Sequence, residues 1–304
     1  MRNTDYDLVI IGGGPGGISA AIYAARRNIK TVLIAHELGG YVPYIDVIEN
    51  YPGFSKISGI DLTKHFLDQL ALYDVTILEG ETVTRLTSNT EGVRVKVGRK
   101  TISAKYAIVA SGCTKRILNI PGEKKFRNKG VTYCSICDGP AFADQSVAVI
   151  GGSNSGLKSA LYFSGIAKHV YLIESRAQLG GEKVMQGQLA NCKNVTVILN
   201  AQLEKVTGTR FLEGLCYTDT VTHEKHQLAI EGLSVEIGVV PQCDFVDVVK
   251  DKHGHIKVNT KLQSSNKRIY AIGDVNTAGA EQIVIAVGQG ASASLEVAKN
   301  LRLV

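Results

Sequence analysis

The chain has 304 residues, of which 44% are hydrophobic and 20% are charged; this composition excludes a wholly disordered protein and allows about two domains. Its 34 lysines and arginines against 28 acidic residues give a net charge of +6, and no zinc-finger or RNA-binding pattern indicates a nucleic-acid partner. No apolar run approaches the ~18–20 residues of a membrane span, so we expect no membrane insertion. No apolar segment follows the first five residues, so we expect no signal peptide and a cytoplasmic protein.

A pattern of strand, glycine-rich turn, helix and strand occurs twice, about 139 residues apart from Gly12 to Gly151. The first copy predicts strands at 8–11 and 31–34 around a helix at 18–27, and the second predicts strands at 146–150 and 170–173 around a helix at 157–166. Alternating apolar residues within 81–109 predict a β-meander packed on the first domain. A last strand is expected at 268–274 and a last helix at 283–301. Two such units predict two nucleotide-binding-type domains.

The first turn has glycines in the GxGxxG spacing. Gly12 allows the tight turn, Gly14 lets backbone approach a pyrophosphate, and Gly17 lets helix and strand pack closely. Glu37, twenty residues later, could accept a hydrogen bond from a ribose hydroxyl, or it could be a solvated loop carboxylate. Asp274 could bind a second polar part of the same ligand, or it could only cap a helix. The pattern predicts a dinucleotide site, with a purely structural turn as the alternative.

Two of the six cysteines, Cys134 and Cys137, form a CxxC motif. This spacing can close a disulfide within one turn, and it can hold one thiolate at a lowered pKa, the form that attacks disulfides. Half of a zinc site is an alternative, but no second CxxC or nearby histidine pair completes four ligands, so we expect no metal. An inert pair is the other alternative. The isolated cysteines are predicted to be small, partly buried apolar residues: Cys113, Cys192, Cys216 and Cys243.

The chain resembles the low-molecular-weight thioredoxin reductase family in segments that run in family order over essentially the whole length. These segments are Gly12–Gly17, Glu49–Gly53, Ala110–Gly112, Cys134–Asp138 and Ala271–Asp274. The resemblance implies FAD in the first site and a homodimer. The FAD-binding roles that it implies fall on Gly12, Gly14, Gly17, Asn50, Asp274, Gln282 and Ile283, the last two against the pyrimidine end of the flavin.

The same resemblance implies roles in the redox centre. Cys137 would be the sulfur beside the flavin, Cys134 would attack the disulfide of a partner thioredoxin, and Asp138 would be the acid–base that moves the proton. Considered alone, Asp138 could instead be only a helix cap.

The second turn departs from the pattern. Ser153 occupies the position of the middle glycine. Glu174 and Arg176 follow the next strand, where relatives that use NADPH have arginines for the 2′-phosphate. A carboxylate beside a phosphate monoester is repulsive, so NADPH is disfavoured, whereas Glu174 could accept from the free ribose hydroxyl of NADH.

Residues 115–129 contain six lysines or arginines and a single acid, Glu123. This basic cluster could be an ordinary solvated face, or it could steer an acidic protein toward the CxxC motif. The chain resembles the ferredoxin-dependent branch of the family, which lacks the NADPH signature. Another branch has a second FAD at the place of NADPH.

We therefore expect an α/β protein with two doubly wound Rossmann-like domains, the second inserted into the first. The FAD-binding domain is expected at 1–115 and 244–304, and the inserted pyridine-nucleotide-type domain with the CxxC motif at 116–243. Our hypothesis is a flavin-dependent disulfide oxidoreductase that reduces thioredoxin with electrons from reduced ferredoxin. An NADH- or NADPH-dependent thioredoxin reductase, a two-FAD disulfide oxidoreductase and a flavin redox sensor without turnover are the alternatives.

Overall fold

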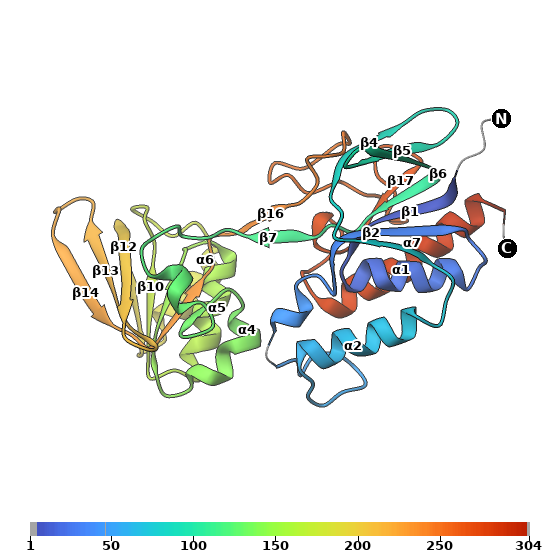
Figure 1. Cartoon of the computed structure of the whole chain (residues 1–304). Coiled ribbons are helices and arrows are strands. Elements are labelled where there is room, and N and C mark those ends of the chain that lie inside the picture. Colours follow the sequence, from blue (N-terminus) through green and yellow to red (C-terminus); the bar gives the residue numbers. More distant parts are fainter. Residues whose placement is uncertain (1–4, 46, 303–304) are drawn as a thin grey trace. The chain divides into compact units, whose positions relative to one another are not determined.

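The computed structural model describes residues 5–45 and 47–302. The chain divides into two compact units (Figure 1). Unit 1 comprises Met1–Thr114 and Val240–Val304, and unit 2 comprises Lys115–Val239. The chain passes from one unit to the other through two short strands that pair with each other, β7 (Cys113–Lys115) and β16 (Val239–Pro241).

Unit 1 is built on a sheet of seven described strands in the order β3-β2-β1-β6-β5-β4, with β17 also paired to β6. The strands are β1 (Tyr6–Gly13), β2 (Thr31–Leu38), β3 (Thr76–Glu79), β4 (Val83–Ser88), β5 (Val93–Val97), β6 (Lys100–Val109) and β17 (Ile269–Ala271). Strands β3, β2, β1, β6 and β17 pair in parallel. Their continuous apolar runs suit a sheet covered on both faces, and Leu8, Val9 and Ile10 are fully buried.

The predicted β-meander is the antiparallel part of this same sheet, because β5 pairs with both β4 and β6. Val93, Val95 and Val97 are buried, whereas Arg94 and Lys96 between them are exposed. The alternation found in the sequence therefore gives one apolar face that joins the core of unit 1.

The helices of unit 1 are α1 (Pro15–Ala25), α2 (Gly59–Leu70) and α7 (Ile283–Asn300), with short 3₁₀ turns η1 (Val42–Tyr44) and η3 (Gly273–Val275) (Figure 1). Helices α1 and α7 pack closely because glycines lie at their contact: a Cβ on Gly290 would lie 2.2 Å from the carbonyl oxygen of Gly16. The hydroxyl of Ser19 also donates to the carbonyl of Val287 at 2.8 Å. This packing fixes α7 against the helix that follows the first glycine turn.

Unit 2 contains a parallel sheet in the order β11-β10-β9-β15-β8 and an antiparallel sheet β12-β13-β14. The strands of the parallel sheet are β8 (Val131–Thr132), β9 (Ser146–Ile150), β10 (His169–Ile173), β11 (Val195–Ile198) and β15 (Gly232–Val235). The antiparallel strands are β12 (Ala201–Gly208), β13 (Leu212–Asp219) and β14 (Lys225–Ala229). The helices are α3 (Glu123–Phe126), α4 (Ser135–Asp138), η2 (Gly139–Phe142), α5 (Asn154–Ser164) and α6 (Lys183–Ala190).

Both units therefore have parallel sheets with helices between the strands, and the predicted α/β class is confirmed. Among the residues that the structure describes, no helix is both long enough and apolar enough to cross a membrane.

Candidate active site

The first glycine turn, between β1 and α1, has two positions that accept only glycine and one that faces open space. Gly12 has φ +116°, and a Cβ there would lie 2.2 Å from the carbonyl oxygen of Ala110. A Cβ on Gly17 would lie 1.9 Å from the oxygen of Gly12. By contrast, no atom lies within 4 Å of a Cβ placed on Gly14, which caps α1. The turn is closed by packing on one side and leaves room at Gly14 for a phosphate at the helix N-terminus.

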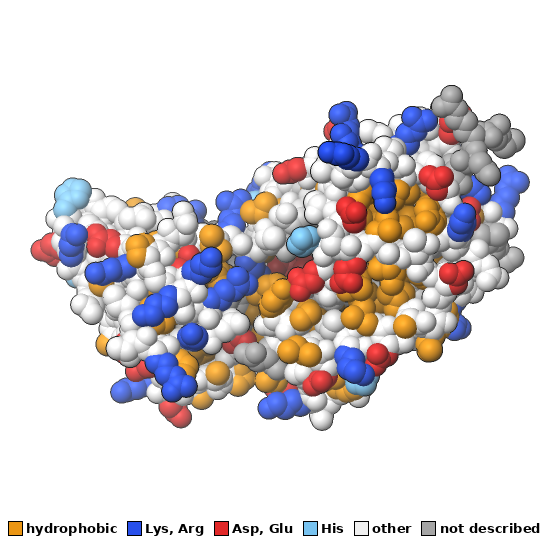
Figure 2. Space-filling model, viewed as in Figure 1, with side chains coloured by type: hydrophobic (Ala, Val, Ile, Leu, Met, Phe, Trp, Pro, Cys, Tyr) orange, Lys and Arg blue, Asp and Glu red, His pale blue; other side chains and the backbone are white. Residues whose placement is uncertain are grey.

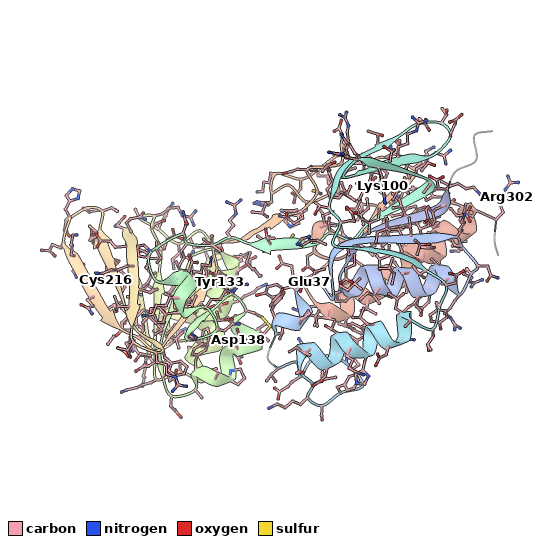
Figure 3. All side chains as sticks on the ribbon, in the orientation of Figure 1. Glu37, Lys100, Tyr133, Asp138, Cys216 and Arg302 are labelled. Atoms are coloured by element: carbon pink, nitrogen blue, oxygen red, sulfur yellow. A yellow bond between two sulfur atoms is a disulfide. The ribbon has the colours of Figure 1, made fainter. Side chains whose placement is uncertain are left out.

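Glu37 lies beside this turn because β2 pairs in parallel with β1. Its exposed carboxylate accepts hydrogen bonds from the hydroxyl of Tyr44 at 2.8 Å and 2.9 Å. Figure 3 labels Glu37 in unit 1. Glu37 is therefore at the strand end where a ribose is bound in dinucleotide folds, and Tyr44 orients it. The sequence offered no signal for Tyr44.

Two of the predicted cofactor residues meet although they are 232 residues apart: Asn50 Nδ2 donates to Gln282 Oε1 at 3.0 Å. Gln282 caps α7 and Ile283 is its first residue. Asp274 lies in η3, which precedes them.

The η3 loop is held by Gln289, which the sequence did not single out. Gln289 Oε1 accepts from the backbone of Gly273 at 2.7 Å and from Asn276 Nδ2 at 2.8 Å. Its Nε2 donates to the carbonyl of Ala278 at 2.6 Å. Nothing in the sequence distinguishes Gln289 from the other polar residues of this helix.

In unit 2, Cys134 and Cys137 are joined by a disulfide, with their Cα atoms 5.3 Å apart. The backbone N–H of Cys137 donates to Cys134 Sγ at 3.3 Å, and the N–H of Asp138 donates to the carbonyl of Cys134 at 3.1 Å. The two sulfurs, α4 and Asp138 thus form one compact turn.

Asp138 is attached to the first cysteine through Thr132, a second residue that the sequence did not single out. The hydroxyl of Thr132 donates to the Asp138 carboxylate and accepts from the backbone N–H of Cys134 at 3.0 Å. Thr132 is 3% exposed, so these bonds are shielded from water.

A buried polar network, which the sequence did not predict, joins the CxxC helix to the rest of unit 2. Ser135 Oγ lies 2.7 Å from Ser159 Oγ, and Ser159 donates to Glu236 Oε1 at 2.8 Å. Ser234 donates to the same oxygen at 3.1 Å. The three serines are buried, so α4 is fixed to α5 and to the end of β15.

The second glycine turn keeps the backbone of the first. Gly151 has φ +114°, and a Cβ on Gly156 would lie 1.6 Å from the oxygen of Gly151. Ser153 has φ −81° and ψ 179°, whereas Gly14 in the first turn has φ −73° and ψ −178°. A serine adopts this conformation without strain, so Ser153 adds a side chain to the turn without changing its path.

Glu174, at the end of β10, is 5% exposed and is hydrogen-bonded on both oxygens. Oε2 accepts from the backbone N–H of Gly152 at 2.7 Å and from the Arg176 guanidinium at 3.0 Å, while Oε1 accepts from Arg176 Nε at 3.1 Å. Burial raises the pKa of this carboxyl, but the bonds from Arg176 and Gly152 outweigh it and lower the pKa to about 2. Glu174 is therefore ionised at neutral pH, and Arg176 is engaged by it.

The single acid of the basic cluster, Glu123, points inward. It is 5% exposed and accepts from the backbone of Leu118 at 2.8 Å and Asn119 at 2.7 Å and from the hydroxyl of Tyr133 at 2.7 Å. Five of the six cations are exposed and Lys115 is half-buried. Figure 2 shows lysine and arginine side chains scattered over the visible face of unit 2. Within the described ranges, no three His, Cys, Asp or Glu residues are grouped so that they could hold a metal ion.

These features define a class of two-domain nucleotide-dependent redox proteins. Residues 6–290 match the model of the pyridine nucleotide-disulphide oxidoreductase family, and the chain belongs to this family. Among known proteins, it is 40% identical over 302 residues to a subunit of the alkyl hydroperoxide reductase of Pseudomonas putida, covering 97% of this chain and 58% of that relative. It is 35% identical over 292 residues to a protein of Bacillus subtilis named NADH dehydrogenase, covering 95% of this chain and 57% of that relative. The chain thus spans less than two thirds of the length of these relatives.

Solved structures give full-length matches. Thioredoxin reductase from Streptococcus pyogenes superposes with a TM-score of 0.88 at 31% identity and covers 98% of each chain. Thioredoxin reductase from Giardia duodenalis superposes with a TM-score of 0.90 at 26% identity, covering 99% of this chain and 100% of that one. The predicted fold of two Rossmann-like domains is confirmed, and so is FAD as the cofactor. The open space at Gly14 and the nearby Glu37 fit such a dinucleotide.

Proposed function

We propose that the chain is an FAD-dependent disulfide reductase that takes electrons from NADH and transfers them through Cys134 and Cys137 to a thioredoxin-type disulfide. The observation that carries this proposal is the disulfide within one turn of Asp138, with Thr132 bonded to both the carboxylate and the Cys134 backbone. Structural neighbours named thioredoxin reductase support the substrate class.

FAD supplies a carrier that accepts two electrons together and fits between a nicotinamide and a dithiol. The residues proposed to bind FAD all lie in unit 1, at the first glycine turn or on segments that lie beside it. They are Gly12, Gly14, Gly17, Glu37, Asn50, Asp274, Gln282 and Ile283.

The reduced dithiol then acts on the partner. The Cys134 thiolate attacks one sulfur of the partner disulfide, forms a mixed disulfide and releases the first partner thiolate. Cys137 attacks the Cys134 sulfur, restores the 134–137 disulfide and releases the second partner thiolate. Asp138, held by Thr132, takes the proton of the attacking thiol and returns it to a leaving thiolate.

Glu174 favours NADH as the donor. Its ionised carboxylate repels a 2′-phosphate and can accept from a ribose hydroxyl, and Arg176 is already paired with it. The preserved backbone at Ser153 leaves the second turn able to approach a pyrophosphate. The B. subtilis relative named NADH dehydrogenase agrees with this choice.

Ferredoxin is the second candidate for the electron donor. The observation that favours it is the basic cluster 115–129, whose lysine and arginine side chains are mostly exposed while its single carboxylate, Glu123, is buried. Such a surface attracts an acidic protein. Homodimerisation and a cytoplasmic location stay predictions.

Donor and substrate can be tested together under anaerobic conditions by adding NADH, NADPH or reduced ferredoxin and recording flavin bleaching and thioredoxin thiols. We expect NADH to be preferred over NADPH by at least about tenfold in kcat/KM. Glu174→Gln should narrow that ratio, whereas the exposed carboxylate control Glu224→Gln should not. Cys134→Ser should bleach with NADH but release no thioredoxin thiols.

The other outcomes identify the alternatives. If the flavin bleaches with reduced ferredoxin but with neither NADH nor NADPH, the electron donor is ferredoxin. Two flavins bound per chain would indicate a second FAD. Bleaching without thiol release in the unmodified protein would leave a redox sensor.

A further inference from the structure

A second group of nucleophilic and titratable side chains lies in unit 1, separate from the proposed FAD-binding residues. Cys113 begins β7, and Asp251 and His255 lie on a turn between β16 and β17. Cys113 Sγ is 3.9 Å from His255 Nε2, and His255 Nδ1 is 3.6 Å from Asp251 Oδ1. Thiol and carboxylate therefore approach opposite nitrogens of one imidazole, the order in which a nucleophile, its base and an orienting acid are arranged in thiol and serine enzymes.

The carboxylate in this group is fixed by its own turn. Asp251 Oδ1 accepts from the backbone N–H groups of His253 at 2.8 Å and His255 at 2.9 Å. Burial raises the pKa of Asp251, but these bonds outweigh it and lower the pKa, so the group is an anion. An anion at Nδ1 favours the tautomer with its proton there, and Nε2 is left as the acceptor that faces the thiol.

The group is accessible to small molecules. The side chain of His255 is 19% exposed, that of Asp251 is 25% exposed, and Cys113 is half-buried. Cys243, by contrast, is 1% exposed, and burial raises the pKa of its thiol. Cys192 is half-buried like Cys113, but its sulfur lies 3.5 Å from Ser164 Oγ and from the carbonyl of Gln188, neither of which is a base.

We propose that Cys113 is a second nucleophilic thiol of this protein, with His255 as its base and Asp251 as the residue that orients the base, and that it reacts with small hydroperoxides. His255 Nε2 takes the thiol proton and the sulfur attacks the peroxide. One S–O bond forms to the terminal oxygen and the O–O bond breaks. The proton passes from His255 to the leaving alkoxide, or to the leaving hydroxide when the peroxide is hydrogen peroxide, and the leaving group departs as an alcohol or as water. Cys113 is thereby oxidised to a sulfenic acid and the peroxide is reduced.

The position of Cys113 gives the oxidation a local consequence. In the structure Sγ also donates to the carbonyl of Asp274 at 3.0 Å, so the thiol hydrogen can point to either acceptor. Oxidation to the sulfenic acid removes the S–H that donates to the η3 backbone, on which Asp274 is a proposed FAD residue. Oxidation of Cys113 is therefore expected to change the flavin absorbance spectrum without consuming the 134–137 disulfide.

The test uses the holoprotein with the 134–137 disulfide intact and with no electron donor. One sample receives iodoacetamide at neutral pH and another receives hydrogen peroxide with dimedone, and peptide mass spectrometry gives a rate for each cysteine. We expect Cys113 to be alkylated at least about tenfold faster than Cys192, and the dimedone adduct to form at Cys113. His255→Gln should reduce the Cys113 rate to that of Cys192, while His253→Gln, on the same turn, should leave it unchanged.

Equal rates at Cys113 and Cys192 in the unmodified protein would overturn the proposal, as would a fast Cys113 in His255→Gln. Should His255→Gln lose its fold, Asp251→Asn replaces it, because an asparagine oxygen can still accept from the two backbone N–H groups. A slow Cys113 in Asp251→Asn supports the proposal, and an unchanged rate overturns it. None of these readouts needs NADH or thioredoxin, so the proposed function can fail while this inference holds, and the reverse.

Discussion

The polar network beneath the CxxC helix should tune how readily the disulfide is reduced. Ser159 receives a hydrogen bond from Ser135 and donates one to Glu236, and both serines are less than 10% exposed. In the oxidised protein the S–S bond itself holds Cys134 and Cys137 together. In the reduced protein only non-covalent contacts do so, and the bond to Ser159 is one of them. Removing this contact should therefore lower the effective concentration of one thiol at the other and make the disulfide less stable.

The size of the effect follows from one hydrogen bond. A buried hydrogen bond contributes about 0.5–1.5 kcal/mol net. If Ser159→Ala makes closure of the disulfide less favourable by about 1 kcal/mol, the dithiol–disulfide equilibrium shifts about fivefold toward the dithiol, or about 20 mV to a more oxidising potential. The potential can be measured by equilibrating the protein with dithiothreitol redox buffers and trapping free thiols.

Matched variants separate this effect from a general loss of stability. Ser159→Thr keeps the hydroxyl and should keep the potential. Ser164→Ala removes a hydroxyl from the same helix that donates to the carbonyl of Leu161 and lies 3.5 Å from Cys192 Sγ, outside the polar network, and should leave the potential unchanged. A Ser159→Ala protein whose melting temperature falls while its potential stays constant would refute the reasoning, because the network would then be structural alone.

Three further results are expected. Thr132→Val should slow thioredoxin thiol release about tenfold while NADH-dependent flavin bleaching is unchanged, because Asp138 loses its positioning partner; stopped-flow absorbance separates the two steps. Gly17→Ala should lose the fold or the flavin, since its Cβ would lie 1.9 Å from a carbonyl oxygen, whereas Gly14→Ala should fold normally and bind FAD more weakly, as flavin release on dilution would reveal. The pKa of Glu174 is lowered from 4.5 to about 2 in the folded protein, so its stabilisation is present above pH 4.5 and is lost as pH falls toward 2. Unfolding titrations at decreasing pH should therefore show up to about 3 kcal/mol lost in the unmodified protein and not in Glu174→Gln.

The local features were predictable because short-range physics specifies them. Apolar runs and glycine spacing located β1, α1, β9 and α5 to within a few residues, since a positive φ or a close backbone approach is required at fixed positions. The predicted strand at 268–274 is shorter, β17, because Gly273 at φ +68° turns the backbone into η3.

The supporting residues were not predictable because their contacts join distant segments. Ser159 and Glu236 are 77 residues apart, and Asn50 and Gln282 are 232 apart. A serine, threonine or glutamine in the sequence has no feature that distinguishes a buried partner from a solvated one. Only the folded topology brings Gln289 to the η3 loop.

The two glycine turns indicate where nucleotide specificity would arise if each turn binds the nucleotide that we propose for it. The φ and ψ angles of Gly14 and Ser153 agree within about 8°, so the turn backbone itself cannot distinguish FAD from the proposed NADH. The difference lies at the next strand end. Glu37 is exposed and bonded to a neutral tyrosine hydroxyl, which a ribose hydroxyl can replace without leaving a charge unpaired. Glu174 is buried and paired with Arg176, so a nucleotide there must share the carboxylate with a cation, and an added 2′-phosphate would compete with Glu174 for that cation. Discrimination at the second turn thus depends on an existing ion pair, which a scan for glycines cannot detect.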